Sequence, residues 1–170
     1  RRDTVSFLHA SAECCGVRSS YTRPAQLGAD RWAAMIGARA FSPAPCLVVC
    51  AGTATTVDLL DAEGVFGGGV ILPGFDLMRS ALADNTAQLP FAEGVFRALP
   101  CCTGDAIYSG CLQAQVGAVE RMFALLAGKS GARCLLTGGG AGRLAEHLKI
   151  PFQLADNLIL TGLVRYAASL

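Results

Sequence analysis

The positions of apolar residues along the chain predict a mixed α/β protein. The segment from Cys46 to Ala51 is continuously apolar and has the length of a buried strand, and the segment after it is rich in β-branched residues. Gly52 lies between these two segments, so we expect a tight hairpin there. The strands predicted in this way are residues 4–9 (TVSFLH), Cys46–Ala51, Thr53–Leu60, Val65–Leu72 and Arg133–Leu136.

Helices are predicted between and after these strands. The polar segment Ser19–Pro24 is expected to be a loop that leads to a first helix near Pro24, which should continue through Arg31–Ala38 and end before Pro43. A long, largely buried helix is expected from Thr103 to Leu126, because apolar residues recur there at helical spacing: Ile107, Cys111, Ala114, Ala118, Met122 and Leu125. The other predicted helices lie at about Phe75–Ala83, around Leu144 and Leu148, and at Asp156–Leu170.

Composition and charge exclude several classes of protein. Hydrophobic residues make up 52% of the 170 residues and charged residues 16%, which indicates a globular chain with a buried sheet or subunit interface. The formal net charge is +1, and no basic cluster is interleaved with aromatic residues, so nucleic-acid binding is not expected. The apolar runs are far shorter than the roughly 18 residues of a membrane-spanning helix. The eight cysteines lack zinc-binding spacing, and we interpret them as buried free thiols of a cytoplasmic protein.

Two glycine-containing segments are candidate phosphate-binding sites. In the hairpin turn Thr53–Thr56, which follows Gly52, closely spaced N–H groups and hydroxyls can face an anion together. Leu135–Gly140 is a strand that runs into three glycines before a helix, which lets the backbone approach a phosphate or nucleotide. The local pattern of the hairpin by itself favours a structural interpretation, in which Gly and Thr serve only turn and strand and Asp58 is a solvated strand residue.

Asp30 and Arg31 are a second pair of candidates, placed after Gly28 and Ala29 in the expected first helix. A carboxylate there can meet a substrate hydroxyl, and a guanidinium can meet a carboxylate or phosphate. Taken alone, the pair is better explained by an Asp that the helix dipole favours and an Arg on a solvated face. The adjacent Trp32 is predicted to be a core residue because of its large apolar surface.

The order of the motifs changes this balance. Seven segments follow one another: Tyr21, GADRW (28–32), GTATTVD (52–58), GGGVILPG (67–74), TAQLP (86–90), TGDAIYSG (103–110) and TGGGAGRL (137–144). In this order they resemble the type III pantothenate kinases, whose relatives include proteins called Bvg accessory factors. The resemblance extends from about Tyr21 nearly to the C-terminus.

The resemblance implies an actin-like, sugar-kinase-like fold with two RNase H-like lobes, in which helices flank a mixed sheet. It divides the chain into the remainder of a first lobe with the GADR helix, residues 1–45, and a second lobe, residues 46–170. Family members open with a strand and an Asp-x-Gly-Asn phosphate motif, which this sequence does not contain. We therefore expect that part of the N-terminal lobe is lacking.

The resemblance also implies an activity, the phosphorylation of pantothenate by ATP to 4'-phosphopantothenate, which is the first step of coenzyme A biosynthesis. Asp30 takes the role of the catalytic base. The residues implied in pantothenate binding are Tyr21, Gly28, Ala29, Asp30, Arg31 and Thr103. Those implied in ATP binding are Gly52, Thr53, Gly138, Gly139 and Gly140.

Metal ions and partners follow from the same resemblance. A Mg²⁺ ion bridging the ATP phosphates is expected. The family binds K⁺ or NH₄⁺ at an Asp of the hairpin, a position that Cys50 occupies here, and a neutral thiol is a poor ligand for such a hard cation. A homodimer with its active site across the interface is expected. The alternative is a non-catalytic accessory or regulatory protein with the same nucleotide-binding fold, an idea that Cys50 and the missing first motif favour.

Overall fold

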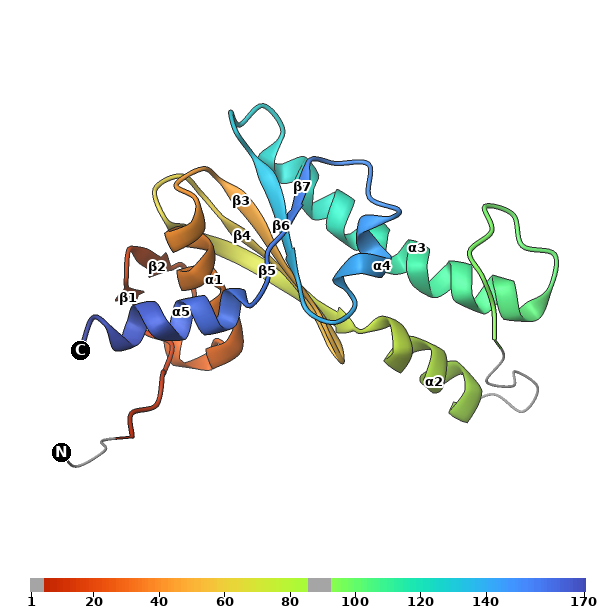
Figure 1. Cartoon of the computed structure of the whole chain (residues 1–170), viewed down its shortest axis with the longest axis horizontal. Coiled ribbons are helices and arrows are strands. Elements are labelled where there is room, and N and C mark those ends of the chain that lie inside the picture. Colours follow the sequence, from red (N-terminus) through yellow and green to blue (C-terminus); the bar gives the residue numbers. More distant parts are fainter. Residues whose placement is uncertain (1–4, 86–92) are drawn as a thin grey trace.

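The structure is a computed structural model that describes residues 5–85 and 93–170 (Figure 1). The strands are β1 Glu13–Cys14, β2 Val17–Ser19, β3 Cys46–Ala51, β4 Ala54–Leu60, β5 Val65–Pro73, β6 Arg133–Thr137 and β7 Phe152–Leu154. The α-helices are α1 Ala29–Phe41, α2 Phe75–Asn85, α3 Thr103–Phe123, α4 Ala141–Ala145 and α5 Leu158–Ala167, and two short 3₁₀ helices are η1 Pro24–Gln26 and η2 Ala124–Leu126. No helix in these two ranges is long and apolar enough to span a membrane.

The described strands form one mixed sheet in the order β1-β2-β5-β4-β3-β6-β7. Strands β3, β4 and β5 are antiparallel neighbours, and the pair Ala51 and Thr55 closes the hairpin between β3 and β4. Strand β6 lies parallel to β3, and β7 lies parallel to β6. Parallel neighbours need long crossover connections, which the helices α3 and α4 provide. The predicted mixed sheet is therefore confirmed.

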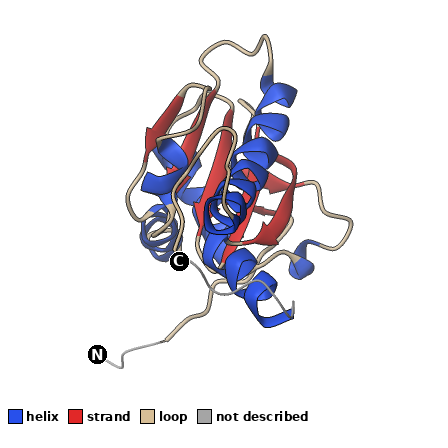
Figure 2. Ribbon diagram, turned by 90° about the vertical axis from the view of Figure 1, so that its right-hand side faces the viewer, coloured by secondary structure: helices blue, strands red, loops and turns tan. Residues whose placement is uncertain are grey.

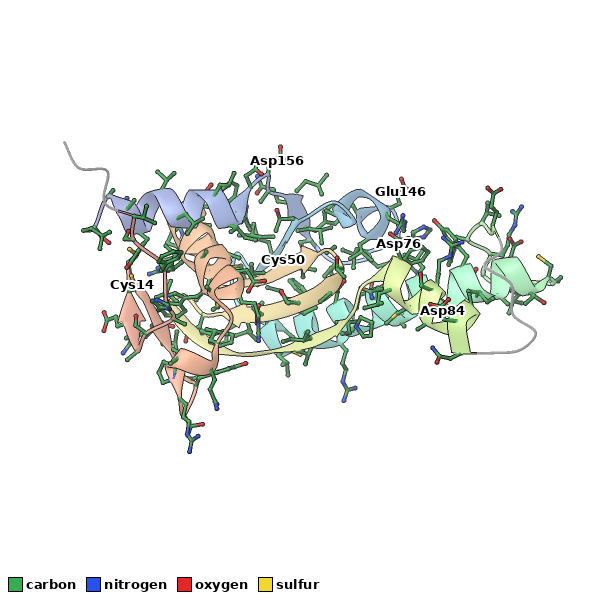
Figure 3. The ribbon with its side chains drawn as sticks, turned by 90° about the horizontal axis from the view of Figure 1, so that it is seen from below. Cys14, Cys50, Asp76, Asp84, Glu146 and Asp156 are labelled. Carbon is green, nitrogen blue, oxygen red and sulfur yellow. The ribbon has the colours of Figure 1, made fainter. Side chains whose placement is uncertain are left out.

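Helices cover both faces of the sheet, as Figure 2 shows. Alternate side chains of β3 point to different cores: Cys46 and Val48 pack with residues of α1 and α5, whereas Leu47, Val49 and Ala51 pack with residues of α3. Figure 3 shows α1 and α5 on one face and α3 on the other. The apolar run of β3 is continuous because both of its faces are buried.

The strand predictions are confirmed in the middle of the chain and wrong at its beginning. The four strands predicted between residues 46 and 136 correspond to β3, β4, β5 and β6. In the TVSFLH segment, residues 5–9 form no strand, and residue 4 lies outside the described residues. Val5 and Phe7 are exposed, and among residues 5–9 only Leu8 reaches the core. Strands β1, β2 and β7 were not predicted, because two or three residues are too few to show a period.

Two of the long helix predictions need correction, and the helix predicted around Leu144 and Leu148 is shorter, because α4 ends at Ala145 and leaves Leu148 outside it. The first predicted helix is two elements, η1 and α1, because Gly28 has an extended backbone (ψ 136°) between them. The second correction concerns α3, which has the predicted length together with η2 but is not largely buried. Its buried side carries Leu112, Gln115 and Val119, whereas Leu125 of the predicted apolar stripe is 64% exposed.

Residues before β3 share a sheet and a core with those after it. Strand β2 pairs with β5, and Trp32 of α1 is fully buried in the same cluster as Leu158 of α5. The core position predicted for Trp32 is confirmed. The lobe boundary at residue 45 stays a prediction.

Helices α1 and α5 lie side by side with their backbones in contact (Figure 1). A Cβ atom on Gly37 of α1 would collide with the carbonyl group of Leu158, and one on Gly162 of α5 would collide with the carbonyl group of Ala33. Only glycine allows this approach. Since α1 carries Asp30 in its first turn, the crossing also fixes the position of that carboxylate.

Replacing Gly162 by alanine should lower the free energy of unfolding by about 1–3 kcal/mol, because the two helices must move apart. The measurement is urea-induced unfolding. The unfolding midpoints are compared with the same slope of free energy against urea concentration for each variant. The matched control is Gly117→Ala in α3, where an added Cβ meets no atom within 4 Å and helix propensity should raise stability by about 0.8 kcal/mol. Equal stability of Gly162→Ala and the native chain would contradict the close crossing.

Candidate active site

Glycines hold the tip of the β3–β4 hairpin in place. The N–H of Gly74 donates to the Thr53 carbonyl (2.7 Å), and a Cβ on Gly74 would collide with the carbonyl of Gly52. The N–H of Gly140 donates to the Ala51 carbonyl (3.0 Å). The tip is thus fixed from both sides by its carbonyl groups.

The segment after β6 contributes the second part of this arrangement. Gly138 has a left-handed backbone (φ 94°), and a Cβ there would collide with the carbonyl of Ala51. Within the described part of the chain, the N–H groups of Thr53 and Gly139 have no backbone acceptor. Free N–H groups at a glycine-rich turn are suited to bind an anion. The two segments that the sequence marked as candidates for phosphate binding therefore lie against each other.

A cavity of about 700 Å³ joins the hairpin tip to the beginning of α1. This volume is in the range of small-molecule sites. We call it the Asp30 cavity. Its lining includes Asp30, Cys50, Gly52, Thr53, Thr56, Thr137, Gly138, Gly139, Asp156 and Asn157. The fold therefore brings the predicted base and part of the predicted ATP-binding set to one cavity.

Asp30 lies in the first turn of α1, next to Ala29, the first residue of the helix. Its Oδ1 accepts a hydrogen bond from the N–H of Arg31 (2.8 Å), and a Cβ on Gly28 would lie only 2.6 Å from that oxygen. The missing side chain of Gly28 thus leaves room for the carboxylate. The other carboxylate oxygen of Asp30 has no hydrogen-bond partner among the described residues. It is therefore free to accept a hydrogen bond from a substrate hydroxyl group.

Arg31 is buried and paired inside the protein. Its guanidinium donates to both carboxylate oxygens of Asp58, with Nε to Oδ2 at 3.1 Å, and donates from Nη1 to the hydroxyl of Tyr21 (3.1 Å). Arg31 is 5% exposed and Asp58 1% exposed. The interpretations of Arg31 as an exposed helix residue and of Asp58 as a solvated strand residue are both wrong. Gly69 makes room for the pair, because a Cβ there would collide with the Asp58 carboxylate.

The environment of this ion pair shifts both pKa values. Burial raises the pKa of Asp58 above its ordinary value, against the opposing effect of the hydrogen bonds from Arg31. Burial works against the charge of Arg31, but the Asp58 carboxylate and the Tyr21 hydroxyl raise the pKa of the guanidinium. Arg31 therefore stays charged, and removal of Asp58 would leave that charge buried without its counter-ion.

Cys50 lies on β3, on the face of the sheet that α1 and α5 cover (Figure 3). Burial raises the pKa of its thiol to about 11, so the side chain is neutral at neutral pH. All eight cysteines are free thiols, as predicted. Their predicted burial holds for Cys46, Cys111 and Cys134 and is wrong for Cys101 and Cys102, which are exposed.

Six of the predicted site residues do not line the Asp30 cavity, and they are Tyr21, Gly28, Ala29, Arg31, Thr103 and Gly140. Gly140 lines a second cavity of about 400 Å³ on the other side of the hairpin tip, which also includes Gly52, Thr53 and Gly139. Thr103 lies at the beginning of α3, in an apolar groove of about 1210 Å³ between α2 and α3. That groove shares no lining residue with the Asp30 cavity. Of the sequence motifs, TAQLP (86–90) lies outside the described residues.

Sequence reasoning missed Asp156 and Asn157, which line the Asp30 cavity just before α5. Asn157 has a left-handed backbone (φ 55°), which is uncommon for residues other than glycine and often marks a functional segment. Figure 3 shows Asp156 at the beginning of α5. A polar pair between a strand and a helix was the only available signal, and it is common in loops.

Comparison with known proteins identifies the family. The family model described as "Type III pantothenate kinase" matches residues 2–125. The chain is 66% identical over 157 residues to a type III pantothenate kinase from Aromatoleum aromaticum, covering 92% of this chain and 65% of that protein. It is 55% identical over 163 residues to one from Azoarcus sp., covering 96% of this chain and 62% of that protein.

The chain belongs to the type III pantothenate kinase family. It spans less than two thirds of the length of these two relatives.

Solved structures show the same fold. A protein from Campylobacter jejuni described as a Baf-family transcriptional activator aligns with a TM-score of 0.58 and 24% identity, over 84% of this chain and 64% of that one. A protein from Sinorhizobium meliloti described as a 2-dehydro-3-deoxygalactonokinase aligns with a TM-score of 0.53 and 17% identity, over 82% of this chain and 59% of that one. The predicted actin-like, sugar-kinase-like fold is thereby confirmed.

Proposed function

We propose that this chain forms most of a pantothenate kinase, which transfers the γ-phosphoryl group of ATP to pantothenate and begins coenzyme A biosynthesis. The observation that carries the proposal is the Asp30 cavity, where a carboxylate on α1 and the fixed tip of the β3–β4 hairpin line one space. Membership of the type III pantothenate kinase family supports the choice of substrates.

The proposed reaction divides the cavity between acceptor and donor. The free oxygen of Asp30 takes the proton of the primary hydroxyl of pantothenate, and the hydroxyl oxygen bonds to the γ-phosphorus while the bond to the β-phosphate breaks. The N–H groups of Thr53 and Gly139 bind the phosphates, with Gly52, Gly138 and Gly140 permitting close approach. Catalysis of this kind depends mainly on positioning and charge neutralisation.

Four residues around Asp30 have a positioning role in this proposal, and they are Tyr21, Gly28, Ala29 and Arg31. The Arg31 guanidinium is already bound by Asp58 and Tyr21, so it holds the beginning of α1 against β4. Gly28 and Ala29 set the backbone from which Asp30 projects, and their exposed surface is available to pantothenate. Arg31 and Tyr21 then act on the substrate through the position of Asp30.

The residues present suit a Mg²⁺ ion that enters with ATP. No group of three or more metal-ligating side chains occurs in residues 5–85 and 93–170, but Mg²⁺ commonly keeps several waters and is bound by phosphates with one or two carboxylates. With Asp30 serving as the base, Asp156 is the other carboxylate that lines the cavity and would hold the ion. When bound, Mg²⁺ would neutralise charge on the phosphates.

The residues present do not suit a K⁺ or NH₄⁺ ion at Cys50. Its thiol is neutral at neutral pH and offers no hard oxygen donor. We therefore derive no step of the reaction through a monovalent cation at this position.

We further propose that the protein works as a homodimer in the cytoplasm. The apolar groove between α2 and α3 includes Leu77, Leu82 and Ile107 and is suited to a second copy. Thr103 lies on that groove and not on the Asp30 cavity of its own chain, so a contact between Thr103 and pantothenate requires the second copy. Eight free thiols fit a reducing compartment.

The test is an assay of the purified protein with Mg-ATP and pantothenate. We expect equal amounts of ADP and 4'-phosphopantothenate, identified by mass spectrometry, and no ADP formation above background when pantothenate is omitted. ATP binding without any phosphopantothenate would contradict the proposal and would favour a regulatory role for the same fold.

A further inference from the structure

Gln115 is a buried polar residue of α3 that holds the end of β5. It is 1% exposed. Its amide nitrogen Nε2 donates to the carbonyl oxygen of Pro73, the last residue of β5, and to the sulfur of Met78 in α2 (3.6 Å). The amide therefore binds the chain on both sides of Gly74, the residue that connects β5 to α2.

Gly74 passes this constraint to the tip of the β3–β4 hairpin. Its N–H donates to the carbonyl of Thr53 (2.7 Å), and a Cβ atom on Gly74 would lie 2.0 Å from the carbonyl oxygen of Gly52. The backbone of Gly74 is thus in close contact with both residues of the tip. Because closely packed groups transmit displacements, a shift of the end of β5 would also move Gly52 and Thr53.

The amide of Gln115 has a cost for the fold. Its oxygen Oε1 has no hydrogen-bond partner within the described part of the chain, and a buried acceptor without a donor destabilises a protein. Leu112 and Val119, about one helical turn to either side on the same face of α3, are fully buried apolar residues. An apolar side chain would therefore suit this position for packing alone, and residues that work against stability are expected at functional sites.

We propose that Gln115 is a positioning residue for phosphoryl transfer. From α3 it fixes the hairpin tip at which the phosphates of the nucleotide bind, without touching the nucleotide itself. The proposal rests on the proposed function, because it assumes that the tip binds phosphates. It adds that the site depends on a side chain of α3 that lies outside the seven motifs of the sequence.

The variant Gln115→Met tests the proposal, because methionine has a similar volume and cannot donate a hydrogen bond. At saturating pantothenate, kcat/KM for Mg-ATP should fall about ten- to a hundredfold, since small misplacements of binding groups have effects of this size. The KM for pantothenate should stay within about twofold of the native value. An unchanged kcat/KM for Mg-ATP would overturn the proposal.

Calorimetric titration of the native protein with Mg-ATP separates this inference from the proposed function. Failure of the native protein to bind Mg-ATP would overturn both. Binding by the native protein, together with an equal kcat/KM for Mg-ATP in Gln115→Met, would overturn only the role of Gln115.

The variant Val119→Ala is the control for a loss of stability alone. Val119 is fully buried on α3 and lines neither of the two cavities at the hairpin tip. Its replacement leaves a hole in the core, so it should lower the urea midpoint of unfolding without changing kcat/KM for Mg-ATP. An equal fall of kcat/KM in Val119→Ala and Gln115→Met would show that Gln115 serves only the stability of the core, and would overturn the proposal.

The variant Gln115→Glu gives a second measurement, which decides the matter even if Gln115→Met does not fold. A protonated carboxyl group can donate to the Pro73 carbonyl, whereas a carboxylate cannot. Burial raises the pKa of a carboxyl group, so kcat/KM for Mg-ATP of Gln115→Glu, relative to the native protein at the same pH, should be higher at about pH 6 than at about pH 8.5. A ratio that does not change with pH would overturn the proposal.

Discussion

Replacing Asp30 by asparagine should lower kcat for phosphopantothenate formation by about a thousandfold, the usual contribution of a positioned general base. Asparagine has the same shape and retains the oxygen that accepts the N–H of Arg31, but it cannot take the proton of the acceptor hydroxyl. The affinity for Mg-ATP should change little, because the donor is bound at the hairpin tip. The measurements are steady-state kinetics with varied pantothenate and calorimetric titration with ATP.

The matched control is Glu63→Gln, which removes one carboxylate charge from the exposed turn between β4 and β5. That turn is at the far end of the β4 strand from the hairpin tip, so turnover should remain normal. Normal turnover in Asp30→Asn would contradict the role of base. A loss of ATP binding in the same variant would show that the substitution disturbs the fold and not the chemistry.

Replacing Asp58 by asparagine should lower the free energy of unfolding by about 3–5 kcal/mol, because it leaves the buried charge of Arg31 without its counter-ion. Arg31 is 5% exposed, and a guanidinium group keeps its proton in proteins, so in the variant the charge stays buried and protonated. Guanidinium chloride unfolding followed by circular dichroism gives the change. A loss below about 1 kcal/mol would mean that the pair is weak or solvated.

A double variant distinguishes the pair from simple loss of packing. Replacing Arg31 by methionine together with Asp58 by leucine removes both charges and fills much of their volume, and it should recover most of the lost stability. Catalysis should not recover equally, since the beginning of α1 would lose its hydrogen bonds to β4 and to Tyr21. Full recovery of both stability and kcat would contradict the positioning role of Arg31.

Local patterns predicted the central elements well for physical reasons. The boundaries of β3 match the predicted run Cys46–Ala51, because a strand covered on both faces must be apolar throughout. Gly52 marks the hairpin because the chain reverses there. By contrast, the short strands β1, β2 and β7 depend on pairing with neighbouring strands, which the local sequence does not show. In the same way, the side of α3 that is buried depends on the elements that pack against the helix.

The order of the motifs also predicted the family, although no single motif was specific. The combination of GADRW with GTATTVD pointed to a carboxylate base and a phosphate-binding hairpin. The structure gives that combination a physical meaning, since Asp30 and Thr53 are separated by more than twenty residues and line one cavity.

The sequence by itself determined the strands of the central sheet, the hairpin at Gly52 and the family, because these depend on residue type and spacing. Only the tertiary structure decided what each polar residue does. It paired Arg31 with Asp58 in the core, left the Asp30 carboxylate free at the cavity, and left one oxygen of Gln115 without a partner. A sequence records which groups are present, but whether a charge is exposed, paired or unpaired depends on which distant residues the fold places beside it.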